Sequence, residues 1–431
     1  MRRTLAGISL LLSGSLSPLG AQGLALRDEI GQLFTFGVCG RPLCLDGSVS
    51  AANGHGDHYL PDLATSNAAI ISFLTGSIAE NTSSVPTTAS AGGITYKFVG
   101  GLPVRTSESV GPIFAERAQP LGRGRIVLGA RYATAELRTL RGTPIDRIAL
   151  NFTHQNVGNP QFGDPVLEND VLRVDLDLKV GLDVTSVFAS YGISDRVDLS
   201  VVVPVVHTTL QARAAAQIIP FGPGTQHFFS GTSEHPELSA GSATFGSYTG
   251  IGDIALRGKA SLYATDQYGV SVLGDLRLPT GDEANFAGSG SVNARAMLVG
   301  SARFGTFSPH LNLGYLRRGS ARANDVVLAT LGFDQPTGSW ATLAGELVAE
   351  WQPGANATTL PGTVTYDVPY VRTVEPTNIP NSKDNRVLGS FGVKVRTSAT
   401  GPILLADMLV PIVRGGLQPT VMWTIGFDMG L

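Results

Sequence analysis

VLRVDLDLKVGLDVTSVFASY, residues 171–191, alternates between apolar and charged side chains with a period of two. Every even position from Leu172 to Val184 is aliphatic, and the odd positions between them hold Arg, Asp, Lys or Gly. No helix presents this pattern, because only a period of two places the two sets on opposite faces. A strand that crosses a bilayer needs about 9–11 residues, with its apolar side toward lipid and its polar side toward a wet lumen. We therefore predict a strand of an outer-membrane β-barrel whose charged face lines the lumen.

The alternation recurs in later segments. Leu256 and Leu262 oppose Asp253 and Arg257, and the last segment is apolar at every second position up to Leu431. We predict an all-β fold, a transmembrane antiparallel β-barrel of about fourteen strands, because a single-chain bacterial barrel has an even number of strands. The barrel occupies residues 91–431, and its predicted strands are residues 91–101, 111–118, 123–137, 171–191, 196–211, 250–263, 268–279, 291–304, 307–317, 325–333, 339–351, 385–397, 402–413 and 419–431.

The composition excludes several other classes of protein. Charged residues make up 15% of the chain, yet no run of about eighteen apolar residues follows the leader, which excludes helical membrane spans. The 53 glycines are typical of a sheet with bends and tight turns. A formal net charge of −3 without a basic stripe gives no reason to expect a nucleic-acid partner.

Residues 1–23 have the form of a secretory signal peptide. Arg2 and Arg3 precede an apolar run over residues 5–19, and small residues follow where cleavage is expected. Export with a barrel pattern predicts a location in the bacterial outer membrane, with outer-membrane lipids as partners.

Residues 24–90 form a leading segment without the alternation. Apolar residues recur there at helical spacing, first around Leu26 and Ile30 and again over residues 70–78. We predict two short helices that fold into the lumen as a plug, because exposed apolar stripes would otherwise lack a partner. A segment that hangs in the periplasm is the alternative.

Cys39 and Cys44 are the only two cysteines, and they lie within the leading segment. In an oxidising periplasm, an isolated close pair most simply forms a disulfide that closes a small turn. His55 and His58 make a Cys/His metal site conceivable, but neither their spacing nor their glycine-rich context is specific. We predict a disulfide, no metal site and no cofactor.

The polar faces of the predicted strands carry charges of both signs. Their simplest interpretation is a set of cross-strand ion pairs that satisfy one another and hold the plug. The alternative is a polar conduit that moves a solute through weak successive contacts. The charged side chains predicted to line the lumen are Arg173, Asp175, Asp177, Lys179, Asp183, Asp253, Arg257, Lys259, Asp275, Arg277, Arg295 and Arg303.

Catalytic groups are only weakly indicated. The chain has no Gly-x-Ser-x-Gly elbow beside a strand-to-helix pattern and no phosphate-binding Gly-Lys-Ser/Thr loop. His207 and His310 lie close in sequence to Ser200 and Ser308, which leaves an outer-membrane lipid hydrolase as a less favoured alternative. We expect no catalytic residues and no enzyme.

Several motifs resemble those of a known outer-membrane family. They are Gly-Ile-Gly-Asp-Ile at 250–254 with Lys259, Leu-Pro-Thr-Gly-Asp at 278–282, Gly-Ser-Gly at 288–290, Tyr-Gly-Ile-Ser-Asp-Arg-Val-Asp-Leu at 191–199 and Val-Pro-Val at 203–205. In order and spacing they resemble the family named for the phenol-degradation meta pathway. That family is similar in turn to the long-chain fatty-acid transporters of the outer membrane, fourteen-stranded barrels with an N-terminal plug.

The resemblance implies uptake of hydrophobic small molecules. With the barrel pattern, it predicts a passive outer-membrane transporter for hydrophobic or aromatic compounds, with such a solute as a partner. A structural or surface-interaction barrel without transport is the alternative. The closing strand resembles the signal read by the barrel-assembly machinery, a partner during biogenesis, although Leu431 stands where that signal usually has an aromatic residue.

Overall fold

The computed structural model is a β-barrel with an occupied interior. It describes residues 24–36, 43, 71–79, 96–99, 102–105, 110–153, 170–220, 227–232, 234–367, 370–398 and 401–431. The predicted signal peptide and the predicted disulfide between Cys39 and Cys44 lie outside the described residues. No helix in the described ranges has both the length and the apolarity needed to span a bilayer.

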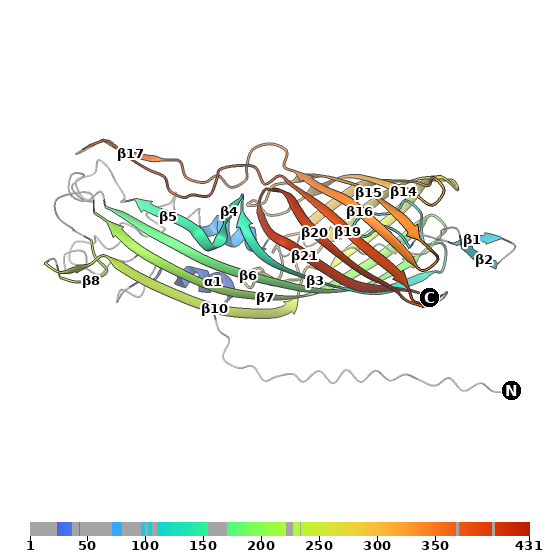
Figure 1. Ribbon diagram of the computed structural model, residues 1–431, viewed down its shortest axis with the longest axis horizontal. Helices are drawn as coiled ribbons and strands as arrows, with labels where there is room; N and C mark the ends of the chain where they lie inside the picture. Colours follow the sequence, from blue (N-terminus) through green and yellow to red (C-terminus); the bar gives the residue numbers. More distant parts are fainter. Residues whose placement is uncertain are drawn as a thin grey trace, which may run out of the picture.

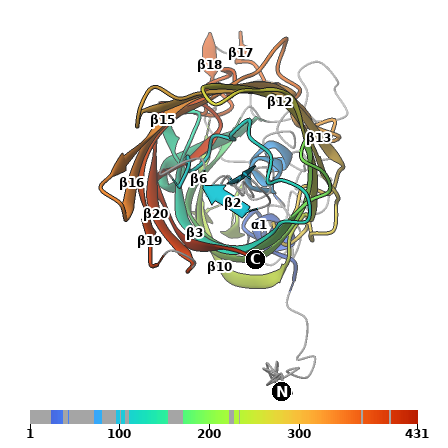
Figure 2. The same cartoon turned by 90° about the vertical axis from the view of Figure 1, so that its right-hand side faces the viewer.

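Twelve antiparallel strands close the barrel. The view along its axis shows the closed ring (Figure 2). In order around the ring they are β3 (Ile126–Leu140), β6 (Val171–Gly192), β7 (Val197–Ile219), β11 (Ala255–Ala264), β12 (Tyr268–Arg277), β13 (Asn293–Ala302), β14 (Ser308–Arg317), β15 (Val326–Thr337), β16 (Ala341–Trp351), β19 (Arg386–Arg396), β20 (Ile403–Arg414) and β21 (Leu417–Gly430). The ring closes where β21 pairs with β3. The predicted fold class is therefore confirmed.

The predicted count of about fourteen strands is too high by two, because the first two predicted strands are not part of the barrel wall. Residues 96–105 form a separate hairpin of β1 (Tyr96–Val99) and β2 (Leu102–Arg105) rather than a barrel strand. Residues 111–118 belong to no strand and instead lie inside the barrel. Apolar residues in these stretches suggested strands, but alternation cannot distinguish a wall strand from an extended segment within the lumen.

The two ends of the barrel differ in the length of their connections (Figure 1). Tight turns at residues 193–196, 265–267, 303–307 and 338–340 join strands at the end where the C-terminus lies. Longer connections at 141–170, 220–238, 278–292 and 352–385 join strands at the other end. Because short turns are periplasmic in such barrels, the long loops are extracellular.

The outer face of the barrel wall is apolar between these two ends. On β14, Leu313 is 47% exposed while its neighbour Asn312 is buried. On β21, Trp423 and Ile425 are exposed while Thr424 is buried. A closed sheet leaves no unpaired strand edge and can therefore cross a bilayer with this apolar face against lipid. The protein is an outer-membrane β-barrel.

β6 reverses its polarity along its length. From Leu172 to Val184, the aliphatic even positions are buried and face inward. The odd positions face outward, and farther along this same face Val187 and Tyr191 are about half exposed. The prediction of lumen-lining side chains is therefore wrong for Arg173, Asp175, Asp177, Lys179 and Asp183.

The length of β6 explains the reversal. The strand has 22 residues, about twice what a bilayer crossing requires. Its first half stands beyond the membrane, where water lies outside the wall and the apolar plug lies inside it. Alternation with a period of two separates two faces, but it does not tell which medium each face meets.

The extracellular half of the barrel is extended by three further strands and filled by the plug. β4 (Thr143–Pro144), β5 (Ile148–Thr153) and β10 (Ser239–Ile251) join the sheet outside the ring, and the short 3₁₀ helix η3 (Ile145–Arg147) lies between β4 and β5. Helix α1 (Leu26–Gln32) lies inside the ring (Figure 2), and residues 71–79 are also helical. Two small hairpins, β8 (Ser230–Gly231) with β9 (Pro236–Glu237) and β17 (Val364–Tyr366) with β18 (Arg372–Val374), lie in the extracellular loops.

The plug helices share one apolar core with the inner wall. Ile30 and Phe34, together with Leu74 from the second helix, are buried against the aliphatic face of β6. The Phe34 and Phe152 rings meet edge to face, with their centroids 6.0 Å apart. Burial of apolar side chains stabilises such a core by about 25 cal/mol per Å². The prediction of two short helices folded into the lumen is confirmed for the described residues.

Candidate functional site

Residues 110–121 form a luminal segment inside the barrel near its periplasmic end (Figure 2). The predicted strand at 111–118 is wrong, because this segment joins no sheet in the described part of the chain. Pro112 and Pro120 lack the backbone N–H that a strand ladder needs. Many of the other backbone groups of the segment bond to side chains of the wall instead.

Glu346 of β16 holds the first part of the luminal segment. Its buried carboxylate accepts three hydrogen bonds from the backbone N–H groups of residues 113–115, at 2.7, 2.8 and 2.9 Å. Lys394 of β19 is also buried and donates to the carbonyl of Pro112. Hydrogen bonds to an ionised group are about twice as strong as neutral ones. The segment is therefore tied firmly to this side of the wall.

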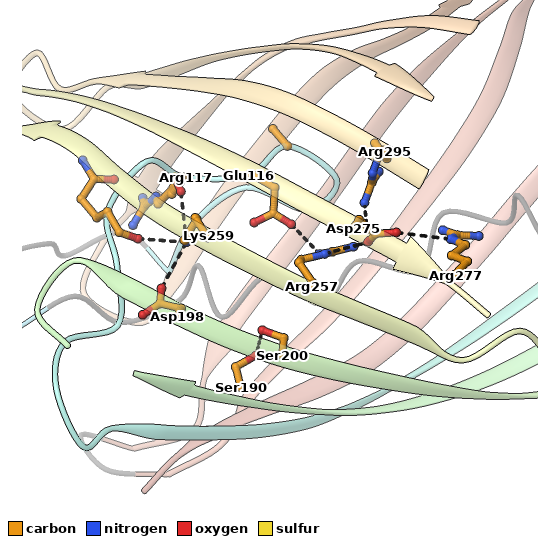
Figure 3. Close-up of polar contacts among 12 residues, drawn as sticks. Glu116, Arg117, Ser190, Asp198, Ser200, Arg257, Lys259, Asp275, Arg277 and Arg295 are labelled. Atoms are coloured by element: carbon orange, nitrogen blue, oxygen red, sulfur yellow. Dashed lines mark hydrogen bonds and ion pairs between the residues drawn. The ribbon is translucent and has the colours of Figure 1, made fainter. Parts of the chain in front are cut away.

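A cluster of arginines and carboxylates surrounds the middle of the luminal segment (Figure 3). Arg257 of β11 bridges Glu116 of the segment, at 2.7 Å, and Asp275 of β12, at 2.9 Å. Asp275 also accepts from Arg295 at 3.0 Å, and Nε of Arg277 lies 3.8 Å from it. One wall carboxylate thus interacts with three arginines, while Glu116 links the luminal segment to the cluster.

The end of the luminal segment is bound by β7 and β11. Nζ of Lys259 donates to the carbonyls of Arg117 and Gln119 at 3.2 and 3.0 Å. The backbone N–H of Leu121 donates to both carboxylate oxygens of Asp198 at 3.0 Å. Nζ of Lys259 lies 3.7 Å from Asp198, so the two wall residues also attract each other.

The remaining side of the wall completes the attachment. Arg117 donates to Asp334 of β15 at 2.7 Å, and His310 of β14 contacts the other oxygen of that carboxylate. The backbone N–H of Ala118 donates to Oγ of Ser301 on β13 at 3.0 Å. Residues 110–121 are thus fastened around most of the ring, and they occupy the periplasmic end of the lumen.

The structure places the predicted lumen-lining side chains in three different locations. Asp253, Arg257, Lys259, Asp275, Arg277 and Arg295 lie on the inner side of the wall. Arg303 does not join them, because it lies at the periplasmic turn and donates to the carbonyl of Asp266 at 2.7 Å. The five charged residues of β6 lie on the outer face of the extracellular extension, as described above. The interpretation as ion pairs holds for the inner group, which combines Arg, Lys and Asp.

Asp253 fastens the connection between β12 and β13, residues 278–292, which we call the motif loop. Its carboxylate accepts from the N–H of Gly281 at 3.1 Å and from the N–H and Oγ of Ser289 at 2.8 Å. A Cβ at Gly288 would lie only 2.8 Å from Cα of Gly281, so close backbone contact requires glycine there. The motif residues therefore have a structural role.

The motif loop also holds the plug. The N–H of Arg27 donates to the carbonyl of Ala284 at 2.9 Å, and the N–H of Leu26 donates to Oδ1 of Asn285 at 3.1 Å. These are two of the N–H groups at the start of α1 that have no partner within the helix. Phe286 is buried in the same core as α1. The motif loop thus joins the wall to the plug.

Sequence reasoning missed Glu116 and Arg117, the two charged residues of the luminal segment. Treating 111–118 as a wall strand concealed them, because its polar side chains then have no assigned partners. The proline at each end of the segment was the available signal. Asp334 was also missed, since it was placed in a turn, whereas β15 continues to Thr337.

The serine and histidine positions considered for a lipid hydrolase do not form a catalytic pair in the described structure. Oγ of Ser200 lies 2.8 Å from Oγ of Ser190 (Figure 3), and Nδ1 of His207 lies 2.7 Å from Oγ1 of Thr249. His310 contacts Asp334 rather than a serine hydroxyl. These contacts give the hydrolase alternative no support.

Residues 155–341 match the family described as "Putative MetA-pathway of phenol degradation". The predicted family resemblance is confirmed. The match covers β6 through the start of β16, and it therefore includes the motif loop and the wall residues Arg257, Lys259 and Asp275. No curated protein matches the chain.

Several solved outer-membrane barrels are similar to this chain at low identity. An outer membrane channel from Pseudomonas putida F1 is 11% identical with a TM-score of 0.42, covering 73% of this chain and 98% of that one. A Pseudomonas aeruginosa FadL homologue is 13% identical with a TM-score of 0.32, covering 71% and 89%. The TodX monoaromatic hydrocarbon channel, as a deletion mutant, is 10% identical with a TM-score of 0.33, covering 73% and 91%.

Proposed function

We propose that this protein is a passive outer-membrane transporter for hydrophobic or aromatic small molecules. The observation that carries the proposal is the change of chemistry along the interior. The extracellular half is filled by an apolar and aromatic core that includes Phe34, Phe152 and Phe229, and the periplasmic half is charged. An apolar interior lowers the cost of leaving water for an apolar solute but not for an ion or a sugar. The family match over residues 155–341 supports the same proposal.

A second candidate is a structural or surface-interaction barrel without transport. The attachment of the luminal segment favours it, because residues 110–121 bond to β7, β11, β13, β15, β16 and β19 and occupy the periplasmic end. Transport along the barrel axis would require this segment to move. The two functions differ in whether solute enters cells faster when the protein is present.

Whole cells provide the first test, because the outer membrane itself hinders entry of apolar solutes. Uptake of radiolabelled toluene over seconds is compared between cells that express the protein and cells that lack it. The transporter predicts faster initial uptake with the protein. Equal uptake in both strains would reject transport of this solute class and leave the structural barrel.

A disulfide that locks the luminal segment tests the route. A Cβ added at Gly269 would lie 3.0 Å from Cβ of Ala118, close to the spacing of about 3.5–4.5 Å found in disulfides. Cysteines at both positions, with Cys39 and Cys44 replaced by serine, should block uptake when oxidised and restore it on reduction. The two single-cysteine variants are the controls. Uptake that is unchanged by oxidation of the paired variant would reject an exit through the periplasmic end and favour exit sideways through the wall.

A further inference from the structure

A small cavity lies at the extracellular mouth of the barrel, away from the luminal segment. It lies between the helix at residues 71–79, the loop between β14 and β15, the extracellular ends of β16 and β19, and the turn before β21. We call it the mouth cavity. Its volume is about 70 Å³, and roughly 10–15 Å³ of such volume holds one water molecule. The mouth cavity can therefore hold a group of several heavy atoms.

Three guanidinium groups are part of the lining of the mouth cavity. Arg318, Arg322 and Arg386 line it together with Glu350. Glu350 accepts from Arg386 at 2.7 Å, and NH2 of Arg318 lies 3.8 Å from the same oxygen. The Arg318 and Arg386 side chains are mostly buried, whereas Arg322 is exposed at the rim. Arg318 and Arg386 thus share one carboxylate, and Arg322 adds a third cation to the lining. These three arginines outnumber Glu350, which leaves an excess of positive charge.

The other lining carboxylate, Asp384, does not reduce this excess. Nε of Arg141 lies 2.8 Å from its Oδ1, and this buried arginine stands behind the cavity wall. The Arg141 guanidinium lies over the Phe73 ring, 4.4 Å from the ring centroid. The cavity lining and Arg141 behind it together contain four arginines and two carboxylates. An anion in the mouth cavity would be attracted by the remaining positive charge.

The lining of the mouth cavity also includes apolar side chains. Phe73, Val326 and Leu417 are among the lining residues and are each less than a tenth exposed. Phe73 and Leu417 also belong to the apolar core that fills the extracellular half of the barrel. The cavity lining therefore combines arginine side chains with side chains of the apolar interior. This combination fits a molecule with an anionic end and an apolar body.

We propose that the mouth cavity is an entry site for the carboxylate end of an amphipathic solute, an aromatic or aliphatic carboxylic acid. This inference rests on the proposed transport function and narrows its solute class. The planar guanidinium groups of Arg318 and Arg386 match a carboxylate, which arginine binds through paired hydrogen bonds. The apolar body of the solute then lies toward Phe73 and the plug.

Binding of benzoate to the purified full-length protein in detergent tests the assignment. Calorimetry compares benzoate with benzyl alcohol, which has the same ring without the charge, and with inorganic phosphate, which has the charge without the ring. We expect benzoate to bind about tenfold more tightly than benzyl alcohol, because a hydrogen bond to a charged group accounts for about that factor. We expect benzoate also to bind more tightly than phosphate, because only benzoate buries an apolar ring. Benzoate affinity should also fall as salt rises. Equal affinity for benzoate and benzyl alcohol, or for benzoate and phosphate, would overturn the assignment.

Arginine variants locate the site. Arg318→Gln and Arg322→Gln should each weaken benzoate binding by about tenfold. Arg317→Gln is the matched control, because it removes the same charge from the neighbouring position of β14, whose side chain is exposed on the outer face. Heat-modifiable migration on a denaturing gel confirms that each variant is folded. An equal loss of affinity in Arg317→Gln would reject the mouth cavity as the site.

The proposed function and this inference fail separately. Toluene has no carboxylate, so its uptake by cells tests transport without involving the arginines. Toluene uptake together with no preference for benzoate would reject only the carboxylate site. Absence of both toluene and benzoate uptake would reject transport and the inference with it.

Discussion

Glu346→Ala should release the luminal segment from the wall. The Glu346 carboxylate accepts three backbone hydrogen bonds from residues 113–115, at 2.7–2.9 Å. Each bond to a charged acceptor contributes about 1.5–3 kcal/mol, so their sum has an upper bound of about 9 kcal/mol. Water entering the vacated space would satisfy part of the freed N–H groups. We therefore expect detachment of this segment to become easier by about 3 kcal/mol, a shift of about a hundredfold in the equilibrium.

Conductance and proteolysis both report this detachment. In a planar bilayer, the variant should spend much more time in a conducting state than the wild type, because residues 110–121 occupy the periplasmic end of the lumen. Trypsin added to the detergent-solubilised protein should cleave after Arg117 much faster in the variant, since Arg117 is buried in the wild type and pairs with Asp334.

Glu350→Ala is the matched control for this prediction. It removes the same side chain from the same strand, four residues closer to the extracellular end, where Glu350 pairs with Arg386 and not with the luminal segment. Glu350→Ala should leave the cleavage rate at Arg117 unchanged. A Glu346→Ala protein that is folded and yet conducts and is cleaved like the wild type would refute the view that this carboxylate anchors the segment.

Three further predictions concern the wall. Asp275→Ala leaves three arginines without their shared carboxylate, so thermal unfolding in detergent should show a loss of about 3 kcal/mol; an unchanged midpoint would contradict this role. Gly288→Ala should lower the folded fraction on a heat-modifiability gel, whereas Gly274→Ala, where an added Cβ meets nothing within 4 Å, should not; equal behaviour would argue against the tight loop. In a chain with Cys39 and Cys44 replaced by serine, Asp177→Cys should react with a membrane-impermeant maleimide on intact cells and Val187→Cys should not; protection of the cysteine at position 177 would restore the lumen-lining assignment.

Local patterns in the sequence determined the fold class. The period of two in β11, β13 and β21 identifies strands with one lipid-facing side, because a bilayer imposes one medium on every second side chain of the wall. The same period in β6 identifies a strand, although the aliphatic side of its first half faces the plug. The helical spacing of Leu26 and Ile30 likewise predicts a helix, since the apolar face of a short segment depends only on neighbouring residues. The motif residues predicted the family match over residues 155–341.

Only the tertiary structure decided which face of each strand points into the barrel. The charged row of β6 faces outward because the strand continues beyond the bilayer. In that part of the strand the outer face meets water and the inner face meets the apolar plug. Residues 110–121 became a luminal segment rather than a wall strand because Glu346, Arg257 and Lys259 lie around them, on strands distant in sequence. Alternation is a local property of the chain, but the medium that each face meets depends on where the closed barrel places it.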